Sequence, residues 1–304
     1  MKSVRVKIDL NLAFKYIAFF FTIVVLCIIA LLVGELILHS AEVILRYGFS
    51  FFFGWNWDPK ANIYGALPMI YGTLFTATLA LLIAIPISIG IATFLTEIAP
   101  PKLREFLTTT IELIAAIPSV VIGLWAIFYL APLIRDIIHP LFKPLSFIPF
   151  FSGETFGYCY LTATLVLVFM ITPIMTSIFK EAFESVPKDL KDAMYALGAT
   201  RYETIRHITI PFSRTAIFAG TILAYGRALG ETLAVTMVIG NQPNITLSLF
   251  SPGYTLAAVI ANEFIEATSR LHVAALIGMG LILFIISLIV NFVGVILLKR
   301  LKRW

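Results

Sequence analysis

Two ionisable side chains stand inside a long apolar stretch of this sequence. Arg227 and Glu231 are the charged residues of the run from Thr215 to Gly240, which is long enough to cross a bilayer as a helix. A charge at the bilayer centre costs about 2.5–3.5 kcal/mol on insertion scales, so such residues line a pathway or pair with each other. Because they are four residues apart, the two side chains would share one helix face. The spacing predicts an intramembrane ion pair.

Two roles for this pair are open from the residues alone. The planar guanidinium of Arg227 offers donors that match the oxygens of a phosphate or carboxylate. In an anion-handling role, Glu231 holds Arg227 and competes with the passing anion, so that binding stays weak enough for release. In a structural role, the pair fixes helix packing, and Gly226 and Gly230 allow another helix to approach closely.

Three hydroxyl side chains are further candidates for a pathway. Thr232 directly follows the charged pair, whereas Thr73 and Ser119 lie in two other apolar runs. The hydroxyls of Thr73 and Ser119 can instead bond to backbone carbonyls that Pro86 and Pro118 leave free. That second role is the simpler interpretation for both residues.

The chemistry of most enzyme classes is absent from the sequence. It holds no G-x-x-x-x-G-K-[ST] loop for nucleotide phosphates, no H-E-x-x-H zinc motif and no G-x-S-x-G nucleophile motif. The four histidines fall in loops or at helix ends, and the two cysteines have neither metal-binding nor disulfide spacing. We therefore expect no catalytic residue, no metal site and no cofactor bound by this chain.

The composition requires a membrane protein. Of 304 residues, 60% are hydrophobic and 13% are charged, and the mean hydropathy is +0.98. A soluble domain carries about twice that share of charge, so soluble enzymes, disordered regulators and secreted disulfide scaffolds are excluded. The net charge of +5 would suggest nucleic acid in a soluble protein. In a membrane protein it reflects basic cytoplasmic loops, so we expect no nucleic-acid partner.

Six apolar runs are long enough to cross a bilayer. The first is longer than the apolar part of a signal peptide, so we expect it to be retained. The runs predict an all-α membrane protein with one transmembrane domain over residues 1–304, a first helix at 16–38, a core at 67–298 and a long cytoplasmic loop at 180–214. They are Tyr16–Leu38, a segment within Ala61–Thr96, Leu107–Ile134, Thr155–Phe179, Thr215–Gly240 and Leu271–Leu298, with a short outer or re-entrant helix at Thr255–Phe264.

The distribution of Lys and Arg predicts the orientation. Six crossings put both termini on one side, and cytoplasmic termini place sixteen basic residues inside, five outside and one, Arg227, in the membrane. This asymmetry predicts a multi-pass protein of a prokaryotic plasma membrane with both termini in the cytoplasm. The sixteen residues are Lys2, Arg5, Lys7, Lys15, Lys102, Arg104, Lys180, Lys188, Lys191, Arg201, Arg206, Arg214, Lys299, Arg300, Lys302 and Arg303.

The long cytoplasmic loop has an organised sequence. Pro187 suits the first turn of a helix whose apolar residues recur at three- to four-residue spacing. Gly198 stands where a left-handed residue ends a helix. Thr200 and Glu203 form a capping box for a second short helix, and Pro211 ends the unit before the next crossing. Apolar residues in such a loop predict that this helix–glycine–helix unit docks onto a partner protein.

This unit resembles the EAA loop in the permeases of bacterial ABC importers. The family pattern is Glu-Ala-Ala, three residues, Gly, nine residues and Ile-x-Leu-Pro. The chain has Asp192-Ala193-Met194, then Gly198, then Ile208-Thr209-Ile210-Pro211 in the same register. In that family the loop fits a groove on a separate ATPase subunit and transmits ATP-driven closure. The resemblance implies this coupling role for Asp192, Ala193, Gly198, Ala199, Thr200, Ile208 and Pro211.

A second resemblance covers nearly the whole chain, from about Trp55 to Ile296. It is to the phosphate-uptake permeases of the PstC type, and it implies the MetI-like fold of type I ABC-importer permeases and import of inorganic phosphate. It also implies a related second permease subunit (PstA-like), two ATPase subunits (PstB-like) that use ATP and Mg, and an extracytoplasmic phosphate-binding protein (PstS-like). The segments that carry it are Leu67-Pro68 with Tyr71-Gly72-Thr73, Ile117–Gly123, Tyr225–Thr232 and Ala234–Asn241.

Other functions are open at this point. An importer of the same class for sulfate, molybdate or another oxyanion would also need Arg227. A proton-coupled secondary transporter could use Glu231 as its coupling carboxylate, but it would offer no reason for the unit that ends at Pro211. A structural or receptor-like membrane protein gains nothing from an arginine in the membrane.

Overall fold

The computed structural model describes the backbone of residues 10–301 and the side chains of residues 14–300. Within these ranges the chain forms helices, one short hairpin and connecting loops. Part of the predicted orientation depends on basic residues outside the described ranges, namely Lys2, Arg5, Lys7, Lys302 and Arg303.

Six helical segments are long and apolar enough to cross a membrane, which confirms the predicted number. They are Phe14–Tyr47, Leu67–Ile98, Ser119–Leu145, Tyr160–Glu184, Arg201–Gly230 and Arg270–Arg300. The helices of the first three segments and their connections are α1 (Leu10–Tyr47), α2 (Phe49–Phe53), α3 (Leu67–Thr93), α4 (Pro101–Ala115), α5 (Ser119–Trp125), α6 (Ala131–Leu133) and α7 (His139–Phe142). The later helices are α8 (Tyr160–Glu184), α9 (Lys188–Ala196), α10 (Arg201–Thr204), α11 (Ile210–Gly230), α12 (Leu233–Val238), α13 (Leu256–Glu263) and α14 (Arg270–Leu301).

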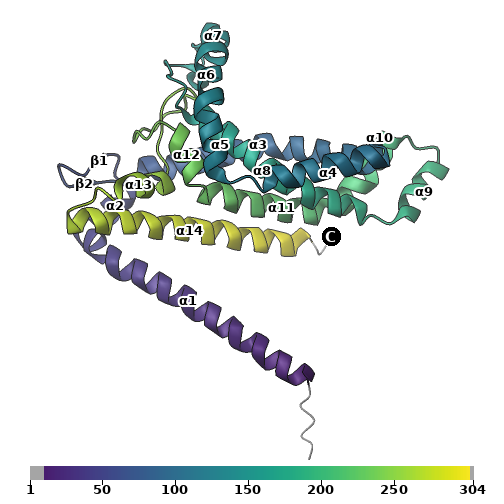
Figure 1. The fold of residues 1–304 in the computed structure, drawn as a ribbon, viewed down its shortest axis with the longest axis horizontal. Helices are drawn as coiled ribbons and strands as arrows, with labels where there is room; N and C mark the ends of the chain where they lie inside the picture. Colours follow the sequence, from purple (N-terminus) through teal and green to yellow (C-terminus); the bar gives the residue numbers. More distant parts are fainter. Residues whose placement is uncertain (1–9, 302–304) are drawn as a thin grey trace, which may run out of the picture.

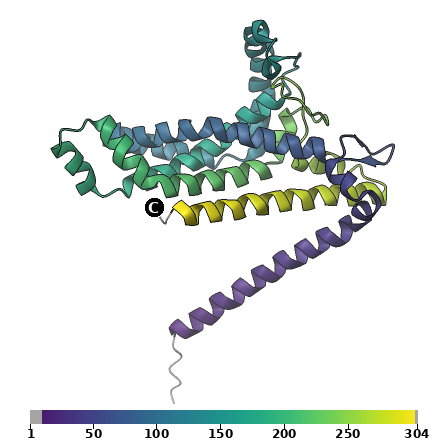
Figure 2. The same ribbon diagram turned by 180° about the vertical axis from the view of Figure 1, so that it is seen from behind.

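Four helices run side by side along the long axis of the molecule. α3 packs along α8, α8 along α11 and α11 along α14, and Figures 1 and 2 show this bundle from opposite sides. The arm formed by α5, α6 and α7 projects across the bundle direction (Figure 1). The first half of α1 lies apart from the bundle and its second half packs against α14, and no residue of its most apolar stretch is buried.

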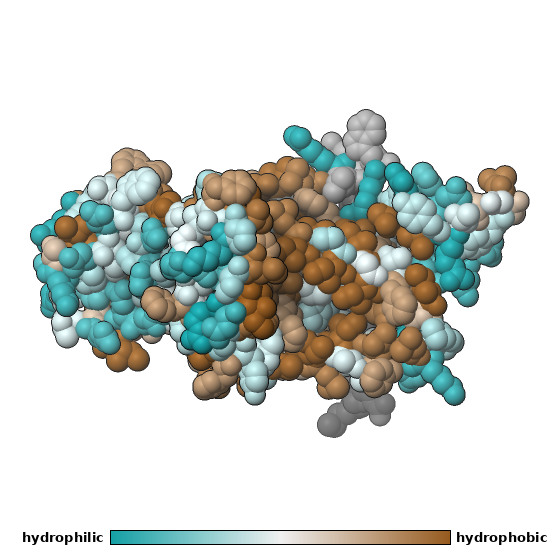
Figure 3. Space-filling view, turned by 90° about the horizontal axis from the view of Figure 1, so that it is seen from above, coloured by the Kyte–Doolittle hydropathy of each residue, from teal (hydrophilic) through white to brown (hydrophobic). Residues whose placement is uncertain are grey.

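The two ends of the bundle carry different elements. The end that carries α9 and α10, called here the loop end, also holds the end of α14, and α1 begins toward it (Figure 1). The opposite end, called here the hairpin end, holds α2, α13 and the strands β1 (Trp57–Asp58) and β2 (Ile63–Tyr64). Figure 3 shows hydrophobic side chains gathered in the middle of the molecule and hydrophilic ones toward its two ends. This distribution suits a bundle that crosses a bilayer along its long axis.

The third crossing begins later than the sequence predicts. α4 ends at Ala115, the chain turns at Pro118, and α5 starts at Ser119. Pro118 has an extended ψ of 138°, and a proline ring disfavours helical geometry at the residue before it. The predicted run Leu107–Ile134 is therefore two helices. The segment here that is long and apolar enough to cross a membrane is Ser119–Leu145, in the arm that projects across the bundle.

Small side chains explain the close packing of the bundle. Ala77, Ala80 and Ala84 on α3 are fully buried in the main core, which α3 forms with α8, α11 and α12. Alanine at these positions lets the helix backbones approach closely, as is common where helices pack in membranes. Large side chains of α8, such as Phe179 and Phe183, fill the remaining space.

A polar network holds the hairpin to the helices beside it. Glu263 at the end of α13 accepts hydrogen bonds from the Trp57 indole at 3.0 Å and from the Tyr254 hydroxyl at 3.2 Å. The Nε2 of His272 on α14 lies 3.0 Å from the same carboxylate. The predicted short helix at Thr255–Phe264 is present as α13, and the Thr255 hydroxyl caps it by accepting from the Ala258 N–H at 3.2 Å.

Candidate translocation and coupling sites

The fifth crossing is broken at the predicted ion pair. α11 ends at Gly230, Glu231 has an extended ψ of 125°, and α12 begins at Leu233. The prediction of one helix through Thr215–Gly240 is therefore wrong. Glycine is a poor helix former, and the Glu231 carboxylate accepts a hydrogen bond from the Ala234 N–H at 3.4 Å, in the first turn of α12. The glutamate therefore helps to start α12 instead of continuing α11.

This break separates Arg227 from Glu231. The two side chains share a face only if the helix continues over both, and it stops between them. Among the described side chains, no carboxylate oxygen lies within 4.0 Å of the Arg227 guanidinium. The predicted intramembrane ion pair is therefore wrong. Arg227 is exposed in the last turn of α11, where a cation is favoured by the free carbonyls of the helix end.

The helix that follows the break packs against α5, which itself begins after the Pro118 turn. A Cβ added to Gly123 of α5 would lie 2.6 Å from the sulfur of Met237 and 3.1 Å from the Cα of Ala234, both on α12. Two interrupted helices therefore meet inside the apolar region. Interrupted helices leave backbone donors and acceptors free, and in membranes they occur where the protein buries them or where they line a watery path. This makes the region around Arg227 the candidate translocation site.

The three predicted hydroxyls lie in different surroundings. Thr73 is buried, donates to the Met69 carbonyl at 2.8 Å and accepts from the Leu256 N–H at 2.9 Å, so it ties α3 to α13. Thr232 donates across the break to the Gly230 carbonyl at 3.2 Å. Ser119 is half-buried at the first position of α5. Their pathway roles stay predictions, with Thr73 engaged in packing in this structure.

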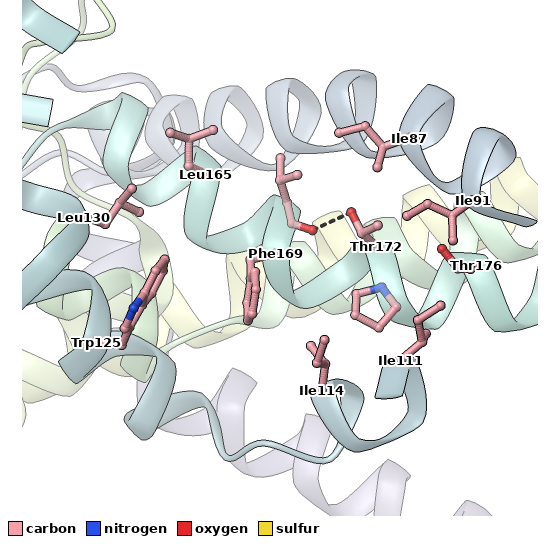
Figure 4. Close-up of a pocket in the computed structure, with 12 residues that line it drawn as sticks. Ile87, Ile91, Ile111, Ile114, Trp125, Leu130, Leu165, Phe169, Thr172 and Thr176 are labelled. Atoms are coloured by element: carbon pink, nitrogen blue, oxygen red, sulfur yellow. Dashed lines mark hydrogen bonds between the residues drawn. The ribbon is translucent and has the colours of Figure 1, made fainter. Parts of the chain in front are cut away.

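A large pocket between α3, α4, α5 and α8 offers nothing to an anion. It has a volume of about 400 Å³, and its polar side chains are Thr172 and Thr176. Figure 4 shows its aromatic wall, with Trp125 of α5 facing Phe169 of α8. The Thr172 hydroxyl is already used, because it donates to the Val168 carbonyl at 2.7 Å. The pocket therefore lacks the cationic donors that a phosphate or sulfate needs.

The 180–214 loop folds as the predicted helix–glycine–helix unit. α9 is followed by Gly198 at φ +85°, a left-handed conformation that glycine adopts readily. The predicted capping box is confirmed. The Glu203 N–H donates to the Thr200 hydroxyl at 3.3 Å, and the Thr200 N–H donates to the Glu203 carboxylate at 2.7 Å. Asp192 and Ala193 are exposed on α9.

The second helix of the unit does not end at Pro211. A π-helical turn, η6 (Ile205–Thr209), joins α10 to α11, so one continuous helix runs from Arg201 to Gly230. The Ile210 N–H donates to the Ile205 carbonyl in the wider π register. The widened register of a π turn leaves the next backbone N–H without a partner. Proline has no N–H, so Pro211 can follow the turn at no cost in hydrogen bonding. Pro211 therefore lies inside the helix that enters the bundle.

An apolar surface is exposed on the unit. Leu197 is 85% exposed and Tyr202 is 66% exposed, on either side of Gly198. Tyr195 and Leu190 on α9 are also exposed. Exposed apolar residues at the polar end of a bundle indicate a protein–protein contact. This surface is the candidate ATPase-coupling site.

Sequence reasoning missed the side chains that hold α9 to the bundle. The Lys191 ammonium forms an ion pair with the carboxylate of Glu97, in the π turn η1 (Phe94–Ile98) that ends α3. Both side chains are largely buried, at 16% and 9% exposure. Glu97 is the first charged residue after an uncharged run, yet nothing in the sequence connects it to a lysine 94 residues away.

Comparisons with known proteins agree with this geometry. Residues 84–303 match the family described as the binding-protein-dependent transport system inner membrane component. A phosphate transport system permease protein PstC of Mesorhizobium japonicum is 42% identical over 91% of this chain and 86% of its own length. A probable PstC of Methanocaldococcus jannaschii is 41% identical over 99% of this chain and 96% of its own.

Solved structures confirm the predicted MetI-like fold. A chain of the inward-facing MetNI methionine ABC transporter matches with a TM-score of 0.60 at 15% identity, over 81% of this chain and 99% of that one. A chain of a bacterial alginate ABC transporter, solved with a periplasmic protein, matches with a TM-score of 0.56 at 15% identity, over 92% and 93%. The chain thus belongs to the family of binding-protein-dependent inner-membrane transport components, among the PstC-type permeases, and is a multi-pass transport subunit and not an enzyme.

Proposed function

We propose that this chain is a permease subunit of an ATP-driven importer of inorganic phosphate and forms half of its translocation pathway. The observation that carries the proposal is Arg227, which is exposed at a helix break inside the apolar region and has no carboxylate within 4.0 Å among the described side chains. A free guanidinium can bind two phosphate oxygens at once. The relatives at 41–42% identity carry the name of phosphate permeases, which favours phosphate among the oxyanions.

The proposed partners follow from the two ends of the bundle. The 180–214 loop would contact one of two ATPase subunits (PstB-like), which bind ATP and Mg, while this chain itself binds no cofactor. A related permease (PstA-like) would complete the pathway, and an extracytoplasmic phosphate-binding protein (PstS-like) would deliver the anion at the hairpin end. In this arrangement both termini are cytoplasmic, as the excess of basic residues at the loop end favours.

A single helix supports the mechanism of coupling. The segment Arg201–Gly230 is continuous and, at 1.5 Å per residue, is about 44 Å long. Its first turns belong to the coupling unit, and its last turn carries Arg227. A movement that the ATPase imposes on Tyr202 would therefore reach Arg227 through a rigid helix. Displacement of Arg227 would change how well the site holds the anion.

The cargo is tested by uptake of labelled phosphate into vesicles that contain the complete importer, with excess unlabelled oxyanions as competitors. We expect unlabelled phosphate to abolish labelled uptake and sulfate or molybdate to leave it nearly unchanged. Full competition by sulfate would refute phosphate as the cargo while leaving the transport class intact.

The coupling contact is tested by co-purification in mild detergent. We expect Leu197→Asp to release the ATPase, because it places a charge in the centre of the apolar contact. Ile265→Asp is the matched control, since Ile265 is equally exposed, at 91%, but lies at the hairpin end. If the ATPase stays bound to Leu197→Asp, or never accompanies the wild-type chain, the proposed coupling contact is wrong.

A further inference from the structure

A groove opens between α8, α11 and α14 at the loop end of the bundle. Its volume is about 490 Å³, within the range of about 300–1,000 Å³ that is common for small-molecule sites. Its lining is mostly apolar, with contributions from Ala182, Ala216 and Leu298. The polar lining residues are Ser185, Ser213, Thr215 and Lys299, and the two serine hydroxyls already donate to the Ala182 carbonyl. One cation in a mostly apolar lining distinguishes this groove from the charge-free pocket between α3, α4, α5 and α8.

The sequence of α11 explains why the groove is there. α11 and α14 are antiparallel and touch closely at Gly294, where an added Cβ would lie 2.5 Å from a methyl carbon of Ile222. Further toward the loop end, α11 presents Ala216 and Ala219, whose side chains are too small to fill the space beside α14. The two helices therefore leave a groove beside the end of α14, where Val295, Leu298 and Lys299 line it.

The charges around the groove favour an anion. Lys299 is exposed and has no carboxylate within 4.0 Å among the described side chains. On α8, Glu184 is paired with Lys180 at 3.7 Å, so its charge is neutralised. Glu181, next to the lining residue Ala182, is the other acidic residue of this part of α8. Arg214 lies in the sequence next to Thr215, and Arg300 directly follows Lys299. Both arginines are exposed. The balance at this edge is positive.

We propose that this groove binds the headgroup of an anionic phospholipid of the cytoplasmic leaflet, with Lys299 on the phosphate and Thr215 as a hydroxyl donor. A lipid fits better than free phosphate because the groove continues into exposed apolar side chains, Phe212 at 51% and Val295 at 49%, along which acyl chains can lie. Basic pockets between helices on the cytoplasmic side of membrane proteins bind such headgroups. The inference rests on the proposed cytoplasmic position of the loop end.

The test measures lipid retention by native mass spectrometry. The purified importer in mild detergent is incubated with equal amounts of phosphatidylglycerol and phosphatidylcholine, with and without millimolar inorganic phosphate. We expect preferential retention of phosphatidylglycerol, which Lys299→Gln lowers about five-fold, the effect of removing one basic residue near an anionic surface. Lys299→Arg should restore the preference. Arg300→Gln is the matched control, because it removes the same charge one residue away without touching the groove.

Several outcomes would overturn the proposal. Equal retention of both lipids, or an equal loss in Arg300→Gln, would show that only the general surface charge acts. Displacement of the lipid by inorganic phosphate would make the site one for the free anion. Ala219→Leu should fill the groove and abolish retention in an intact complex; loss of the second permease subunit instead would show that the groove is a subunit interface. The assay needs no transport, so its failure is distinct from a failure of phosphate uptake.

Discussion

The ion pair between Lys191 and Glu97 should determine whether α9 stays in place for the ATPase. No residue of α9 is fully buried, so this partly buried pair is its main polar attachment to the bundle. Exposed ion pairs contribute about 0.2–1 kcal/mol. Removal of one partner from a fully buried pair costs about 3–5 kcal/mol. With 16% and 9% exposure, this pair lies between the two limits, and we expect a coupling energy of about 2 kcal/mol.

The assay is a double-mutant cycle of Lys191→Met, Glu97→Gln and the double variant. An energy of about 2 kcal/mol corresponds to about a 30-fold change in the open population of α9, which amide hydrogen exchange of that helix measures. In proteoliposomes, each single variant should lose most of the ATP hydrolysis that loaded binding protein stimulates. The swapped variant, Lys191→Glu with Glu97→Lys, should recover part of it.

The result that refutes this reasoning is a small coupling energy. If the cycle gives less than about 0.5 kcal/mol, the pair behaves as an ordinary surface pair and α9 is held in another way. Normal stimulation of ATP hydrolysis in both single variants would show that the position of α9 does not depend on this contact.

Three further results are expected. Gly198→Leu should uncouple ATP hydrolysis from loaded binding protein, because a side chain at φ +85° costs about 1–2 kcal/mol. Gly198→Asn should keep most of the coupling, because asparagine tolerates this conformation. Equal behaviour of the two variants would contradict the backbone argument. Arg227→Gln should abolish phosphate uptake in a protein that still inserts and assembles, and retained uptake would make Arg227 structural. Hydrogen bonds from the Thr200 N–H and then its hydroxyl lower the pKa of Glu203, so their stabilisation is present above the ordinary carboxyl pKa and is lost as pH falls below about 4. Amide exchange in α10 should accelerate there in the wild type, and the acceleration should be smaller in Thr200→Ala, which loses the hydroxyl but keeps the N–H.

The sequence predicts the number of crossings correctly, and it misplaces two of them for one physical reason. Mean hydropathy registers apolar residues whether or not the backbone stays helical. Pro118 breaks the third run, yet Pro86 and Pro173 lie inside unbroken helices. A proline in an apolar run therefore does not by itself identify a break. The fifth run is likewise broken, since α11 ends at Gly230 and the Glu231 carboxylate caps the start of α12.

Local chemistry predicts the coupling unit better than the crossings. Gly198 and the capping box of Thr200 and Glu203 act within a few residues, so the sequence contains all that their geometry needs. Pro211 is the exception, since the π turn before it accommodates a residue that normally ends a helix. The contact of Lys191 with Glu97 depends on how α8 places the loop beside α3, which no local pattern contains.

The loss of the predicted ion pair strengthens the case for an anion at Arg227. Had Glu231 neutralised the arginine, the pair could have served packing alone, as the structural interpretation required. In the structure, Glu231 instead bonds to the start of α12 and leaves the guanidinium without a carboxylate among the described side chains. A cation in the apolar region costs about 2.5–3.5 kcal/mol, and the carbonyls at the end of α11 offset only part of that cost. The remainder is offset when water or an anion reaches the arginine, which is the condition that a translocation pathway supplies.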